Sequence, residues 1–137
     1  MPHLVILYTG QLDAEVSMST LCKKLADAMR TVKDENYRQV FPTGGIRVMA
    51  YPAPHYAVAD GKAAGGTGDY AFVYLNLRMG RGRSEATQQL AGLTLAEVVK
   101  DFFATVLENR PVGVTFQIDV GAEVFDSRQG NLHPLFR

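Results

Sequence analysis

Apolar and polar positions in the first half of the chain predict a strand, a helix and a second strand. Residues 3–9 are apolar on both faces, as in the middle of a covered sheet. Within residues 17–33 apolar side chains recur at helical spacing, and Ser17 is a plausible N-cap. Residues 45–51 alternate, and Arg47 is one of the side chains on the second face of this expected strand.

The second half repeats this order after a loop at 52–69 that is rich in glycine, alanine and proline. Residues 70–78 read as a strong strand. A helix is expected from the cap Ser84 to about Glu108, and Pro111 blocks its continuation. Residues 112–120 then alternate cleanly between apolar and polar side chains, which predicts a fourth strand.

This element order predicts an α/β (α+β) fold. Helical crossovers join parallel strands with right-handed connections. We therefore expect two β-α-β units, about 1–52 and 69–120, that form one four-stranded sheet with two long helices on one face. The whole chain, 1–137, is expected to be a single domain with a C-terminal tail that docks on the body or on a neighbour. The uncovered sheet face would favour oligomerisation.

Composition narrows the possible partners. Fourteen basic and fourteen acidic side chains give a formal net charge of zero, which argues against nucleic acid or an anionic membrane as partner. No apolar stretch is long enough to predict a membrane span, and the start has no signal-peptide features. The single cysteine, Cys22, lies on the apolar side of the first helix and is expected in the core. These features predict a cytoplasmic protein.

Cationic side chains at turns are the main candidates for chemistry. The three histidines have no metal-ligand spacing, and "GRGRS" lacks the third glycine of a dinucleotide-binding turn. Arg81 and Arg83 stand just before a predicted helix start, where a cation opposes the helix dipole. They either extend into water or capture an anion such as a carboxylate. Arg47 is a candidate for a second clamp, although this arginine taken alone is better explained as a solvated or ion-paired side chain.

The start of the chain raises a separate question. Pro2 directly follows Met1 and precedes an apolar strand. A terminus tolerates most residues, so the proline can be incidental. Removal of Met1, however, would leave a free secondary amine at the mouth of a buried strand.

Four motifs stand out along the chain: "MPHL" at the start, "GGIR" at 44–47, "DYAFVYLNLRMGRGRS" at 69–84 and "NLHPLF" at 131–136. Together they resemble the 5-carboxymethyl-2-hydroxymuconate isomerase family of the tautomerase superfamily. The resemblance runs through nearly the whole chain. It implies a tautomerase-like homotrimer of paired β-α-β units, no cofactor, and a role in bacterial catabolism of hydroxyphenylacetate-type aromatic compounds.

The same resemblance implies roles for individual residues. Pro2 corresponds to the catalytic base of the family, and Arg47 and Arg83 correspond to arginines of its motifs. The chain departs from the family pattern in three places: Arg81 replaces a small residue, Arg78 replaces a lysine, and the loop around 63–67 is longer. Arg81 therefore joins the candidate substrate-binding residues, and the exact substrate stays open.

The resemblance implies a tricarboxylate dienol as substrate, and the residues fit that chemistry. A proton shift along a conjugated system needs one base that accepts a proton and returns it elsewhere. A neutral secondary amine can do both, and burial together with nearby arginines disfavours its charged form. Two alternatives remain: a tautomerase acting on phenylpyruvate-like enols, and a non-catalytic trimeric binding protein with the same fold.

Overall fold

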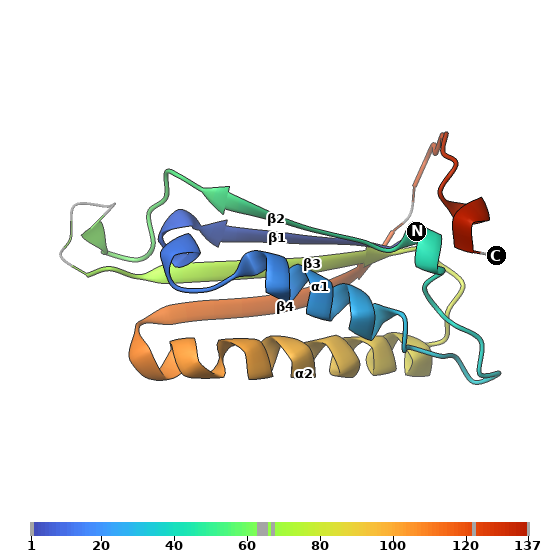
Figure 1. Cartoon of the computed structure of the whole chain (residues 1–137), viewed down its shortest axis with the longest axis horizontal. Helices are drawn as coiled ribbons and strands as arrows, with labels where there is room; N and C mark the ends of the chain where they lie inside the picture. Colours follow the sequence, from blue (N-terminus) through green and yellow to red (C-terminus); the bar gives the residue numbers. More distant parts are fainter. Residues whose placement is uncertain (1, 63–65, 67, 122, 137) are drawn as a thin grey trace.

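A single mixed sheet forms the centre of the molecule (Figure 1). The structure, a computed structural model, describes residues 2–62, 66, 68–121 and 123–136. The strand order is β2-β1-β3-β4. The strands are β1 (His3–Thr9), β2 (Arg47–Ala53), β3 (Ala71–Met79) and β4 (Val112–Val120). β1 is parallel to β2, β3 is parallel to β4, and the two halves join through an antiparallel β1–β3 pair.

Two α-helices cover one face of this sheet. They are α1 (Met18–Met29) and α2 (Glu85–Asn109). The predicted caps are confirmed, because Ser17 accepts from the Thr20 amide and Ser84 accepts from the Thr87 amide. One continuous core joins both helices to the sheet, and its largest fully buried side chains include Leu4, Ile6, Leu21, Leu25, Leu75, Leu77, Leu95 and Phe103. The predicted α+β class and one-sided helix cover are confirmed.

Local boundaries differ little from the prediction. The strands at 3–9 and 112–120 have the predicted bounds, and the others shift by one or two residues. The first helix ends at Met29, earlier than the apolar pattern suggests, because the chain turns back on itself and Val40 donates its amide to the Val32 carbonyl.

Cys22 is only half-buried, although it packs against the core as predicted. Residues 63–65 and 67 of the glycine- and alanine-rich loop lie outside the described residues.

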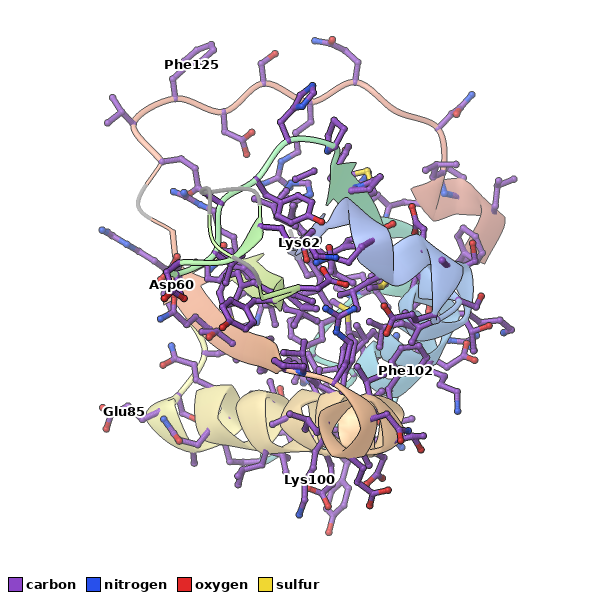
Figure 2. The ribbon with its side chains drawn as sticks, turned by 90° about the vertical axis from the view of Figure 1, so that its left-hand side faces the viewer. Asp60, Lys62, Glu85, Lys100, Phe102 and Phe125 are labelled. Carbon is purple, nitrogen blue, oxygen red and sulfur yellow. The ribbon has the colours of Figure 1, made fainter. Side chains whose placement is uncertain are left out.

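The second sheet face has no helix over it. Its larger exposed apolar side chains are Leu7 (48 % exposed), Met49 (41 %), Tyr51 (49 %) and Phe72 (37 %). The C-terminal tail leaves β4 and crosses the molecule on the side away from α2, with Phe125 directed outward (Figure 2). It ends in the short 3-10 helix η4 (His133–Phe136). Within the described part of the chain, no helix is long and apolar enough to cross a membrane.

Candidate functional site at one edge of the sheet

The sheet topology brings two of the predicted site residues, Pro2 and Arg47, to one edge of the sheet. β1 and β2 begin at the edge where β3 and β4 end. His3, the first residue of β1, has Arg47 as its Cα partner on β2 and Arg78 as its partner on β3. Pro2 is buried immediately before this point. Pro2, Arg47 and Arg78, which come from distant segments of the chain, are therefore neighbours at the edge of the sheet where β1 begins.

The glycines of the "GGIR" motif allow another segment to approach Pro2. Gly44 and Gly45 belong to the 3-10 helix η2 (Thr43–Gly45), which packs against η4. Figure 1 shows both at the end of the sheet where β1 and β2 begin. A Cβ built on Gly45 would lie 3.5 Å from His133 Cε1 and 3.8 Å from Pro2 Cδ. Arg47 Nη1 donates to the Gly45 carbonyl at 2.9 Å. Pro2, Arg47 and His133 thus converge around Gly45.

The electrostatic environment of this edge is positive. The pKa of His3 lies below its ordinary value, first because the ring is partly desolvated and then because the Arg47 guanidinium group opposes a further positive charge, with smaller contributions from Arg128 and Arg78. Arg128 belongs to the C-terminal tail, where its guanidinium group forms an ion pair with Asp126 at 2.6 Å. A basic group held here is biased toward its neutral form, as a proton-accepting amine requires.

Arg81 and Arg83 lie in an adjacent cleft. This cleft has a volume of about 380 Å³ and lies between the 34–42 segment and the turn after β3. Arg83 Nη2 donates to the Val40 carbonyl at 2.8 Å, which fixes its guanidinium group. Pro2 and Arg47 are not among the residues that line the cleft. The predicted site residues therefore form two groups, Pro2 with Arg47 and Arg81 with Arg83, connected by the chain from Pro42 to Gly45.

The start of α2 is already occupied by a carboxylate of the same chain. Glu35 Oε1 accepts from the Ser84 hydroxyl and, at 3.1 Å, from the Thr87 hydroxyl. The pKa of Glu35 is lowered, chiefly because the Ser84 hydroxyl donates to its ionised form. An acidic group at a helix N-terminus also complements the helix dipole. An external anion near Arg81 and Arg83 would therefore meet guanidinium groups rather than helix amides.

Sequence reasoning missed His133 and gave no role to Arg38. The sequence marked His133 only as one of three histidines without metal-ligand spacing, and the structure places its ring against Gly45, which also adjoins Pro2. The "NLHPLF" motif was a signal for this segment, although the motif does not say where the segment docks. Arg38 lines the cleft with Arg81 and Arg83, and no periodicity or motif marked it. Among the described residues, no group of three or more His, Cys, Asp or Glu side chains could hold a metal ion.

Comparisons with known proteins find 5-carboxymethyl-2-hydroxymuconate isomerases that are similar to this chain over nearly its whole length. A solved 5-carboxymethyl-2-hydroxymuconate delta-isomerase is 62 % identical, with a TM-score of 0.91 over 100 % of this chain and 93 % of that chain. A 5-carboxymethyl-2-hydroxymuconate isomerase from Deinococcus radiodurans R1 is 32 % identical, with a TM-score of 0.82 over 99 % and 94 %. The 5-carboxymethyl-2-hydroxymuconate Delta-isomerase of Escherichia coli is 29 % identical over 100 % of both chains.

The fold and the comparisons define the class and then the family. The four-stranded sheet with two helices is the tautomerase fold, and a native fused 4-OT shares it with a TM-score of 0.56 at 15 % identity. Residues 2–136 match the family described as 5-carboxymethyl-2-hydroxymuconate isomerase. The chain belongs to this family, and it is an isomerase.

Proposed function

We propose that this enzyme isomerises 5-carboxymethyl-2-hydroxymuconate, or a similar dienol with several carboxylates, with the amine of Pro2 as base. The observation that carries the proposal is the burial of Pro2 beside Gly45, where Arg47 and His133 also lie. The names of the relatives support the substrate class. The reaction requires removal of Met1, because a proline nitrogen in a peptide bond has no basic lone pair.

The proton transfer needs only one base. The neutral Pro2 nitrogen accepts the proton of the substrate 2-hydroxyl while the C2–O bond becomes a carbonyl. The displaced electron pair moves along the conjugated carbons, and the ammonium returns the proton to one of these carbons. No atom is gained or lost, so the reaction consumes no redox equivalent. A free α-amino group has a pKa of about 8 in water, and burial together with Arg47 favours its neutral form.

The arginines bind and stabilise negative charge. In this proposal Arg47 and Arg83 each bind a substrate carboxylate through charge-assisted hydrogen bonds, and Arg81 contributes from the rim of the cleft. Negative charge that develops on the 2-oxygen in the transition state is stabilised by the same positive edge of the sheet. His133 closes the side of the site formed by Gly44 and Gly45.

We also propose that the enzyme is a cytoplasmic homotrimer. The uncovered sheet face carries Leu7, Met49, Tyr51 and Phe72, all more than a third exposed. Exposed apolar surface of this kind is typical of contacts between subunits. A second copy would cover this face and part of the C-terminal tail, where Phe125 is 84 % exposed.

The test compares three samples of the enzyme: processed protein, protein that retains Met1, and processed Pro2→Ala. Ketonisation of the tricarboxylate dienol is followed by absorbance, and mass spectrometry confirms each N-terminus. We expect the Met1-retaining protein to lose nearly all turnover while its circular dichroism is unchanged. Pro2→Ala keeps a primary amine, so it should retain measurable activity with a shifted pH profile of kcat/KM.

The outcomes separate the proposal from its alternatives. Equal turnover with and without Met1 would show that Pro2 is structural and that another base acts. Turnover of phenylpyruvate-like enols in preference to tricarboxylates would assign the enzyme a different substrate. Binding of carboxylates without turnover in the processed protein would favour the non-catalytic binding protein.

A further inference from the structure

The segment between α1 and η2 forms a tightly bonded turn that presents Arg38. The Asp34 amide donates to the Arg38 carbonyl at 2.9 Å. Asp34 Oδ1 accepts from the Asn36 amide at 2.8 Å and from the Arg38 amide at 3.1 Å. Tyr37 adopts a positive φ of 59°, a conformation that closes the turn. The backbone of Arg38 is therefore held at both its N–H and its C=O.

Two contacts attach this turn to the start of α2. Glu35 accepts from the Ser84 and Thr87 hydroxyls, and Val40 accepts from Arg83. These contacts lie on either side of Arg38 in the sequence. The position of the Arg38 backbone relative to Arg83 is thus fixed by hydrogen bonds rather than by the length of the connecting chain.

The cleft between these segments carries an excess of positive charge. Arg38, Arg81 and Arg83 line it, and among the described residues of its lining Asp34 is the only acidic one. Asp34 already accepts two backbone hydrogen bonds inside the turn. Within the described part of the chain, none of these three arginines takes part in an ion pair. The side chains of Arg38 and Arg81 are exposed, so a ligand can reach them.

The cleft is close to the proposed catalytic edge. Pro42 lines the cleft and lies three residues before Gly45, which adjoins Pro2. Three residues span at most about 10 Å. Arg81 also lies three residues after Arg78, the β3 partner of His3. The backbone therefore keeps the Pro42 side of the cleft within about 10 Å of Gly45, which adjoins Pro2.

We propose that Arg38 is a specificity-determining residue that binds a substrate carboxylate remote from the reacting carbons, together with Arg81. This inference rests on the proposed function, because it places the reacting part of the same substrate at Pro2. The proposal gives the 34–42 turn a role in substrate binding. Substrates with a third carboxylate reach Arg38, whereas shorter monocarboxylates do not.

The test substitutes Arg38→Gln and uses Lys100→Gln as a charge-matched control. Lys100 is an exposed residue on α2 that points away from the sheet (Figure 2). On the tricarboxylate dienol we expect Arg38→Gln to raise KM about five- to ten-fold, with a much smaller change in kcat, as expected for one charged hydrogen bond at an exposed site. Lys100→Gln should match the wild type. Arg38→Lys should recover part of the loss because it keeps the charge.

A calorimetric arm makes the inference independent of turnover. Propane-1,2,3-tricarboxylate and propionate are titrated into the processed wild type and both Gln variants at low salt. We expect Arg38→Gln to weaken binding of the tricarboxylate about five- to ten-fold and to leave propionate binding unchanged. If the wild type shows no isomerase activity, the proposed function fails while this arm still tests the cleft. Equal tricarboxylate affinity of Arg38→Gln and wild type, or an equal loss in Lys100→Gln, would overturn the inference.

Discussion

Substitution of Gly44 by alanine should release the C-terminal segment from the proposed active site. A Cβ at this position would lie 3.0 Å from His133 Cα, 3.1 Å from its Nδ1 and 3.2 Å from its backbone nitrogen. Two of these three atoms belong to the backbone, so a change of side-chain rotamer cannot relieve the overlap. Overpacking of this kind typically costs about 1–3 kcal/mol.

The molecule can avoid most of this cost by opening the tail rather than unfolding. No residue of η4 is buried, and its main contact is with η2. A free-energy difference of about 1.4 kcal/mol changes an equilibrium constant tenfold. An overpacking cost of about 1–3 kcal/mol would therefore raise the ratio of undocked to docked tail about 5- to 150-fold. We expect a small change in the free energy of global unfolding and a much larger change in the accessibility of residues 123–136.

Limited proteolysis with mass spectrometry measures tail opening, and kcat/KM measures its effect on the site. When opening and closing are fast relative to cleavage, the cleavage rate follows the population of the open form. Gly44→Ala should therefore be cleaved faster in the tail and should lose activity because His133 leaves the side of Pro2. Gly130→Ala is the control, since a Cβ there meets nothing within 4 Å. Unchanged tail cleavage and activity in Gly44→Ala would refute the docking argument.

Three further measurements test the site, the core and the assembly. Arg83→Ala and Arg47→Ala should each lower kcat/KM about 10- to 150-fold, because each variant loses one charged hydrogen bond to a carboxylate. Arg81→Ala should lower kcat/KM by a smaller factor. A wild-type kcat/KM for Arg83→Ala would exclude the role of Arg83 as a carboxylate clamp. Tyr8 donates to Asp13 at 2.6 Å, and burial is the main reason that its pKa rises to about 12. Because folding raises the pKa of Tyr8, its neutral hydroxyl contributes to the free energy of unfolding below pH 10, and this stabilisation is lost as the pH rises toward 12. An absorbance titration in which Tyr8 ionises near pH 10 would contradict this prediction. Sedimentation equilibrium should give about three times the chain mass of 15.0 kDa, and a clean monomer would remove the trimer proposal.

Local sequence patterns were sufficient to predict most secondary structure. The alternation in 112–120 and the apolar run at 3–9 gave strand bounds that the structure confirms, because strand faces repeat every two residues. Ser17 and Ser84 marked both helix starts because a capping hydroxyl acts on an amide three residues away. The first helix ended earlier than predicted, because the return of the chain to Val32 is a tertiary contact.

Candidate site residues were recognisable by type and motif, but not by position. Pro2, Arg47 and Arg83 were nominated from the sequence, and only the β1–β2 pairing placed Arg47 beside the start of β1. The sequence did not show that Glu35 would occupy the start of α2, a contact that spans 49 residues to Ser84. It also gave no reason to link Arg38 with Arg81.

The sequence by itself determined the elements, their order and the residues capable of proton transfer and anion binding, because these depend on side-chain chemistry and short-range periodicity. The tertiary structure decided which of them meet. The antiparallel β1–β3 pair brings the start of one half to the end of the other, so that Pro2, Arg47 and Arg78 share one edge. The close approach of His133 to Gly44 depends on the path of the tail after β4. Contacts of this kind join residues far apart in the chain, and local patterns contain no information about them.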